Sequence, residues 1–119
     1  MSLSAFIRKW QKRLGLQHWR IEVADAPEVM LGTDHAQCRL NRTRRVAFLC
    51  LQPADAELSN SALHEMFHVF FDDLDEVAET VFAAGQFTPE VRAALEASYK
   101  VHLNQAIDRL TQAFLEVEK

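Results

Sequence analysis

Apolar residues recur every three or four positions near the N-terminus and through the C-terminal half of the chain, and at every second position in between. The first pattern predicts an amphipathic helix over residues 3–14, which Gly15 is expected to end. The opposite side of this helix is basic and carries Arg8, Lys9, Lys12 and Arg13.

The alternating pattern predicts strands in the middle of the chain. Residues 18–25 and 36–40 each place their apolar side chains on one face, and the run Arg45–Leu51 is apolar enough to be a central or well-covered strand. Residues 41–43 are typical of a hairpin turn, and 26–35 of a loop. We therefore expect a small three-stranded sheet that is antiparallel in part.

From residue 53 onward the pattern is helical. Asp55 or Ser59 can cap a helix that runs through about Asp72, and a shorter helix is expected over 74–85. The pair Thr88-Pro89 is a typical helix start, with Thr as the cap, and the last helix is expected to reach about residue 117. The order predicts one α+β domain over residues 1–119, with helices packed on one face of the sheet.

Composition narrows the class of protein. The chain has 119 residues, of which 49% are hydrophobic and 25% charged, and this balance is typical of one folded domain. A net charge of -4 gives no general affinity for nucleic acid or for an anionic membrane. The local cluster of Arg39, Arg42, Arg44 and Arg45 is interpreted as a solvated hairpin tip.

Cellular location is predicted from what the sequence lacks. It shows no secretory signal and no apolar run of membrane-spanning length. Cys38 and Cys50 lie in apolar alternation, which indicates buried free thiols in a reducing compartment. We therefore expect a cytoplasmic protein.

The segment His64-Glu65-Met66-Phe67-His68 is an H-E-x-x-H motif on a predicted helix. Residues four apart share a helix face, so both imidazoles can bind one zinc ion. Glu65 projects beside that face, where it can take a proton from a water at the open metal position and return it to the leaving amine. Bulky apolar residues surround the motif, so burying its two imidazoles and its carboxylate costs free energy. Such a cost is expected only where these polar groups have a function.

The segment SALHEMFHVFF resembles the active-site helix of the zincin metallopeptidases, and the layout of the chain resembles short H-E-x-x-H proteins of phages and prophages. The matching pieces are the W-x-I-x-V strand at residues 19–23, the run Arg45–Leu51 and the I-x-x-L pattern at residues 107–110. The resemblance implies a zincin-like fold, one zinc ion, and hydrolysis of a peptide or protein substrate.

A third zinc ligand is needed, because a catalytic zinc has three protein ligands and a water. Phe71 and Leu74 occupy the positions where metzincins have Gly and His, so that class is excluded. The resembling phage proteins have acidic residues where the last helix here has HLNQ, and Asn104 points away from the apolar stripe. The ranked substitutes are His102 first, Glu96 second, and third the aspartates Asp72, Asp73 and Asp75, which are expected to end the motif helix and face solvent.

The remaining tyrosine, histidines and tryptophans are weaker candidates for the functional site. Tyr99 can stabilise an oxyanion, although a core position with its hydroxyl at the rim is the more usual explanation. His18 and His35 are expected at the surface, and Trp10 and Trp19 in the core.

Two functions from different classes remain open. The first is an active metallopeptidase, in which the strand Arg45–Leu51 forms the edge of the cleft and pairs with the substrate backbone. The second is a zincin-fold binding or regulatory protein with a degraded or structural metal site, of phage or prophage origin. A third possibility combines the two: a zinc-dependent regulator that cleaves a single partner protein. The sequence does not specify the substrate, the physiological metal or the oligomeric state.

Overall fold

The computed structural model describes residues 2–25, 36–51 and 58–118. The chain divides into two compact units, Met1–Phe70 and Phe71–Lys119. Each unit is described by itself, and the expectation of a single domain stays a prediction. The predicted cap Asp55 lies outside the described residues, and the alternative cap, Ser59, lies within the helix Leu58–Phe70.

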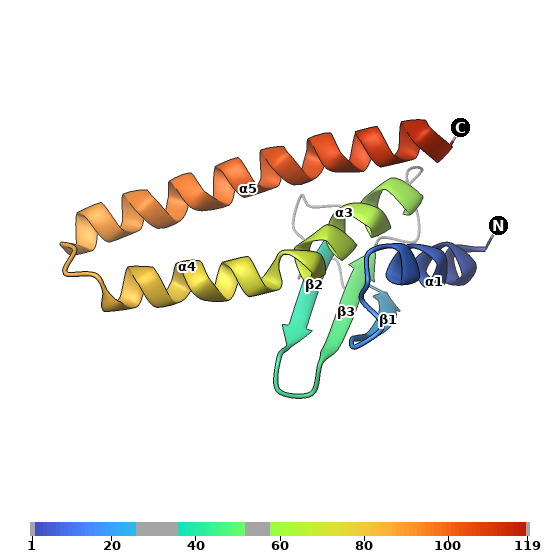
Figure 1. Cartoon of the computed structure of the whole chain (residues 1–119), viewed down its shortest axis with the longest axis horizontal. Coiled ribbons are helices and arrows are strands. Elements are labelled where there is room, and N and C mark those ends of the chain that lie inside the picture. Colours follow the sequence, from blue (N-terminus) through green and yellow to red (C-terminus); the bar gives the residue numbers. More distant parts are fainter. Residues whose placement is uncertain (1, 26–35, 52–57, 119) are drawn as a thin grey trace. The chain divides into compact units, whose positions relative to one another are not determined.

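The first unit contains two helices and a three-stranded mixed sheet (Figure 1). Its elements are α1 (Leu3–Arg13), β1 (Arg20–Asp25), β2 (Ala36–Asn41), β3 (Val46–Leu51) and α3 (Leu58–Phe70). The strand order is β1-β3-β2, with β1 parallel and β2 antiparallel to β3. The predicted α+β class and the partly antiparallel sheet of three strands are therefore confirmed.

The middle strand of this sheet is β3. It pairs with β1 from Arg20 opposite Val46 and with β2 from Asn41 opposite Val46. The apolar run Arg45–Leu51 was expected both to be central and to form the cleft edge, and only the first expectation is confirmed. The second is wrong, because both edges of β3 are already hydrogen-bonded and cannot accept a further strand.

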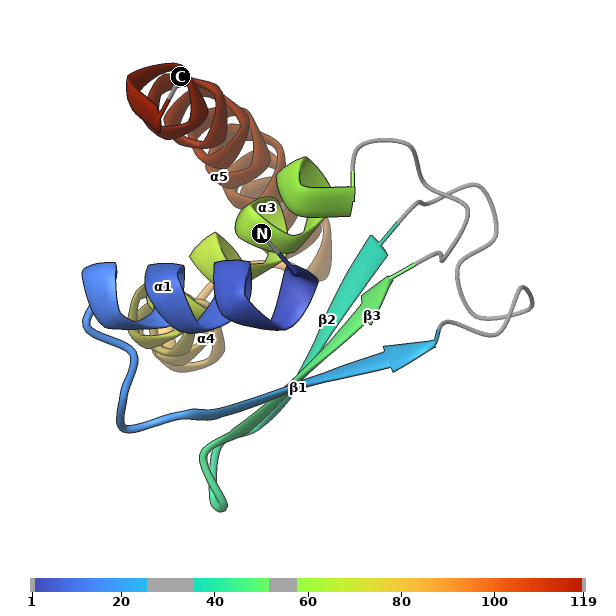
Figure 2. The same cartoon turned by 90° about the vertical axis from the view of Figure 1, so that its right-hand side faces the viewer.

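One face of the sheet is covered by helices. Figure 2 shows α1 and α3 on the same side of the strands, with α3 packed against β2 and β3 and α1 against α3. Leu16, Trp19, Ala47 and Val69 form the buried cluster between them. The expectation of helices on one face of the sheet is confirmed for this unit, as are the core positions of Trp10 and Trp19.

The two cysteines are free, as predicted. Cys38 lies opposite Leu49, whereas Cys50 lies opposite Gln37. Because side chains alternate across a strand, Cys38 and Cys50 face opposite sides of the sheet. Only Cys50 is fully buried, and Cys38 is half-buried.

Helix α1 ends in a Schellman motif. The Gly15 N–H donates to the Lys12 carbonyl at 3.2 Å and the Leu16 N–H donates to the Gln11 carbonyl at 2.8 Å. Gly15 has φ of +69°, a left-handed conformation that residues with a Cβ rarely adopt. The Gln11 side chain also donates to the Trp19 carbonyl at 2.7 Å, which fixes the connection to β1.

The second unit is a pair of helices, α4 (Asp72–Ala84) and α5 (Pro89–Glu118). They are joined by an edge-to-face contact between Phe82 and Tyr99, with ring centroids 6.2 Å apart, and by a hydrogen bond from the Tyr99 hydroxyl to Asp75 at 2.5 Å. The Thr88 hydroxyl accepts from the Val91 N–H at 3.2 Å, so the predicted cap of α5 is confirmed.

The predicted boundary between α3 and α4 is wrong. Helix α3 ends at Phe70, and Asp72, Asp73 and Asp75 form the first turn of α4. Carboxylates are stabilised at helix N-termini by the macrodipole and are unfavourable at C-termini, so the acidic run starts a helix instead of ending one.

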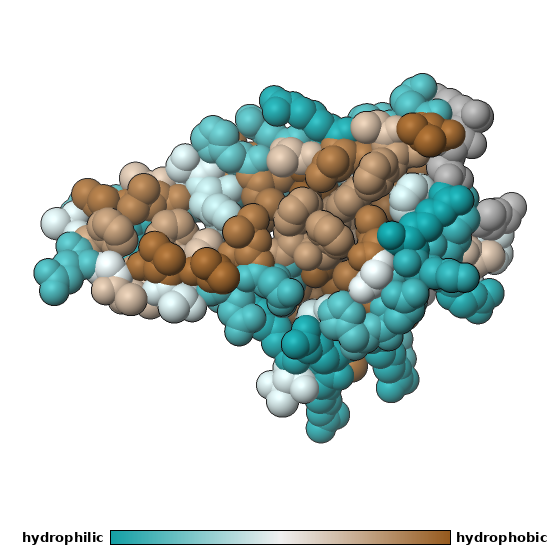
Figure 3. All heavy atoms as spheres, in the orientation of Figure 1, coloured by the Kyte–Doolittle hydropathy of each residue, from teal (hydrophilic) through white to brown (hydrophobic). Residues whose placement is uncertain are grey.

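Apolar side chains are exposed on α4. Leu74, Val77 and Val81 lie one helical turn apart and are each about half exposed. Figure 3 shows hydrophobic atoms on the visible face of both α4 and α5. No described helix combines the length and the apolarity needed to cross a membrane.

Replacing Gly15 with alanine tests the cap of α1. No atom lies within 4 Å of the added Cβ, so the cost comes from the left-handed backbone alone. We expect Gly15→Ala to lower the free energy of unfolding by about 1 kcal/mol, measured by urea denaturation. A variant as stable as the wild type would contradict this account. Gln17→Ala, at an exposed position in the same connection, is the control.

Candidate metal site

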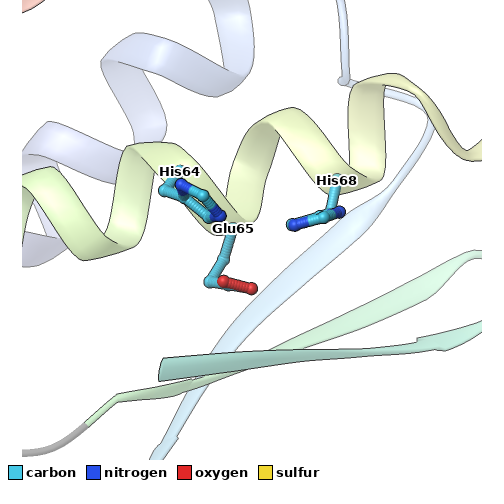
Figure 4. Close-up of side chains that lie close together, drawn as sticks. All are labelled: His64, Glu65 and His68. Atoms are coloured by element: carbon cyan, nitrogen blue, oxygen red, sulfur yellow. The ribbon is translucent and has the colours of Figure 1, made fainter. Parts of the chain in front are cut away.

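The H-E-x-x-H residues lie together on α3. The ligand atoms of His64, Glu65 and His68 are all within 4.8 Å of one another. The two imidazole rings have centroids 5.2 Å apart and are tilted by 58°. Figure 4 shows the three side chains projecting from neighbouring turns of the helix, with Glu65 directed toward the strands. The predicted pairing of two imidazoles with one carboxylate is therefore present.

The rotation of α3 is fixed by its apolar residues. Leu63 and Met66 are completely buried and Phe67 is 2% exposed, so these side chains form the inner surface of the helix. His64 and His68 are half-buried beside that surface, at positions four apart. Glu65 is only 6% exposed. The imidazoles thus lie at the rim of the core and the carboxylate lies within it.

These residues fit a zinc ion. Imidazole nitrogens and carboxylate oxygens are ligands that zinc accepts, and bonds of about 2.0–2.1 Å in a tetrahedral site place neighbouring ligand atoms roughly 3.4 Å apart. The donors of His64, Glu65 and His68 lie within 4.8 Å of one another, so they are grouped closely enough to hold one ion after the side chains adjust.

His102, the first-ranked third ligand, lies on α5 in the second unit and is exposed. Its Nδ1 atom is 2.7 Å from the Ser98 carbonyl, a contact that favours the tautomer with the proton on Nδ1. The lone pair is then on Nε2, the arrangement typical of a histidine that binds a metal through Nε2. Because His102 and His64 belong to different units, ligation by His102 stays a prediction.

The other ranked ligands have partners in the second unit. Glu96 pairs with Arg92 one turn earlier, at 2.9 Å, and Asp75 accepts the hydrogen bond from Tyr99. Asp72 is 2% exposed, and only Asp73 is exposed. The expectation that all three aspartates face solvent is therefore wrong, because two of them lie on sides of α4 that are covered.

Tyr99 joins the two helices of the second unit. Burial raises the pKa of its hydroxyl, and the hydrogen bond to Asp75 and the charges of Asp75, Glu79 and Asp72 raise it further. The hydroxyl has one proton and donates it to Asp75. This agrees with the expectation of a packed ring with its hydroxyl at the rim, and it leaves the oxyanion role without support.

Two further histidines, His18 and His35, are not among the ranked ligands. His18 is exposed and follows the end of α1, as expected, and His35 lies outside the described residues. Sequence reasoning missed that β2 is an outer strand against which α3 packs. The signal for this was the continuous apolar character of residues 46–51, which is typical of a strand with neighbours on both sides.

Comparisons with known proteins give no relative. No protein-family model matches the chain, and no curated protein or solved structure matches it significantly. The chemistry of the site is therefore inferred from its own residues.

Replacing Tyr99 with phenylalanine tests the link between α4 and α5. We expect a loss of about 1 kcal/mol in the free energy of unfolding near neutral pH, because Asp75 loses its donor. Because the pKa of Tyr99 is higher in the folded than in the unfolded state, its protonated hydroxyl stabilises the folded state fully below pH 10, the ordinary pKa of tyrosine. This contribution to the free energy of unfolding is lost as the pH rises above 10. The wild type should therefore lose more stability than Tyr99→Phe above pH 10, and identical alkaline profiles would contradict the assignment.

Proposed function

We propose that this chain is a zinc-dependent metallopeptidase of the zincin type, in which His64 and His68 bind the metal and Glu65 is the general base. The observation that supports this most directly is the group formed by these three residues, with ligand atoms within 4.8 Å of one another on one helix. His102 is proposed as the third ligand. The proposed donor set is three imidazoles, which suits zinc and leaves a fourth coordination position for substrate chemistry, with Glu65 beside it as the base.

Zinc, when bound, polarises the scissile carbonyl and activates a water molecule. Glu65 accepts the proton from the attacking water and transfers it to the amine of the leaving peptide. Its position next to His64 in sequence and inside the core restricts the directions in which its carboxylate can move. A rigid base of this kind reduces the entropy lost on reaching the transition state.

The substrate is proposed to bind beside β2. This strand lies at the edge of the sheet and α3 packs against it, so an extended peptide that adds to β2 as a further strand passes along the helix that carries the motif. The backbone groups of the substrate then continue the ladder of the sheet, and its side chains alternate between the two faces. In this proposal β2, and not residues 45–51, is the strand that pairs with the substrate backbone.

Metal content is the first test. We expect close to one zinc per chain in the wild type, a loss of most of it in His64→Ala and His68→Ala, and a substantial loss in His102→Ala, measured by elemental analysis after dialysis. His18→Ala removes an exposed histidine outside the group and is the matched control. A wild type that binds no zinc, even when zinc is supplied, would refute the proposal.

The role of Glu65 is tested separately. Glu65→Gln keeps the size of the side chain but cannot accept a proton, so we expect zinc to be retained while cleavage of a mixed peptide library falls at least about 100-fold. If the wild type binds zinc but cleaves no member of the library, the alternative of a zincin-fold binding or regulatory protein replaces the enzyme.

A further inference from the structure

Four arginines lie toward one end of the outer strand β2. Arg39 is within the strand, and Arg42, Arg44 and Arg45 belong to the turn that follows its last residue, Asn41. The opposite end of β2 begins with Ala36 and Gln37. Among the described residues, an extended chain lying along β2 therefore meets a cluster of positive charges toward the end at Asn41.

The turn that carries these arginines is held by defined contacts. The Asn41 side chain accepts a hydrogen bond from the Arg44 N–H at 3.1 Å, and the Arg45 carbonyl accepts one from the Arg20 N–H at 2.8 Å. The Arg45 guanidinium lies over the Trp19 ring, 5.4 Å from its centroid. The backbone positions of the charges are thus fixed before any ligand binds, which lowers the entropy cost of binding.

The charges of this cluster remain accessible. Arg39, Arg44 and Arg45 are exposed and Arg42 is half-buried. The neighbouring carboxylate of Glu22 pairs with Arg20 on β1, which offsets a fifth positive charge at the same end of the sheet. Guanidinium groups bind carboxylates through two parallel hydrogen bonds, so acidic side chains are suitable partners.

We propose that these arginines select peptide substrates that carry acidic residues on the flank nearest the turn. The inference rests on the proposed function, because it uses β2 as the strand beside which the substrate binds. A residue paired directly with Arg39 lies about 4.5–5.5 Å from it between Cβ atoms, and each further residue advances the peptide by about 3.3 Å toward the turn. Two to four consecutive acidic residues therefore reach the whole cluster.

An acidic peptide explains this surface better than nucleic acid does. Trp19 is 3% exposed and covered by Arg45, so it cannot stack on a base. Phe48, opposite Arg39 on β3, is 37% exposed, but one exposed ring does not form the series of stacking rings that single-stranded nucleic acid binds. The cluster also adjoins the strand against which the motif helix packs, where a peptidase needs to hold its substrate.

The test compares peptides that differ only in one flank. Each has the same degenerate central segment and, on either the N-terminal or the C-terminal side, three Glu, three Gln or three Lys residues. We expect one of the two Glu-flanked sets to show a KM about three- to tenfold lower than its Gln counterpart with kcat unchanged, and the Lys set to show a higher KM. The difference should shrink at about 0.5 M salt, where charges are screened within a few ångströms.

A matched pair of double variants locates the effect. Arg39→Gln with Arg44→Gln should raise the KM of the preferred Glu peptide to that of the Gln peptide, while Arg8→Gln with Lys12→Gln, an equal charge change on α1, should leave the preference intact. Equal KM values for the three flanks, or an equal effect of both pairs, would overturn the proposal. Displacement of the peptide by a short DNA duplex at lower concentration than by the free Glu tripeptide would overturn it too.

A binding measurement separates this proposal from the proposed function. Fluorescence anisotropy of labelled Glu, Gln and Lys peptides with Glu65→Gln reports recognition without cleavage. If no peptide is cleaved by the wild type but the Glu peptide still binds several-fold more tightly and depends on Arg39 and Arg44, the peptidase proposal fails and the selectivity stands. If cleavage occurs and no flank is preferred in either assay, only the selectivity fails.

Discussion

The packing of α3 against the sheet is the constraint on which the candidate site depends. Leu63, Met66 and Phe67 must be buried together, and their burial fixes the rotation of the helix about its axis. Once that rotation is fixed, His64 and His68 share the adjoining side because four residues span just over one turn. The site therefore needs no loop to hold it, and its two imidazoles have the rigidity that a metal centre requires.

The order of the strands decides what can reach that site. β1 lies beside β3 in parallel, so β3 has neighbours on both edges and β2 is left as an outer strand. The helix α3 crosses β2 and β3, which brings the outer strand next to the helix that carries His64 and His68. Had β1 paired with β2 instead, β2 would have been enclosed and its edge could not accept the proposed substrate strand.

Local features of the fold were predictable from the sequence, and non-local ones were not. The left-handed Gly15, the Thr88 cap and the spacing of His64 and His68 follow from the chemistry of a few neighbouring residues. The apolar run of β3 indicated a central strand, but the parallel direction and the register of its pairing with β1, some twenty residues away, are not specified by alternation within either strand. Asp72, Asp73 and Asp75 were expected at the end of the motif helix, although carboxylates favour the N-terminus of a helix, where the structure has them.

Net charge is a poor guide to the partners of a chain whose charges are segregated. Residues 1–70 contain nine Lys and Arg against seven Asp and Glu, whereas residues 71–119 contain four against ten, so the acidic total comes from the second unit. A ligand on β2 experiences mainly charges within a Debye length of about 10 Å, where the arginines of the turn dominate. An overall negative charge is thus compatible with the proposed preference for acidic peptides, because that preference depends on the local charges along β2 and not on the total.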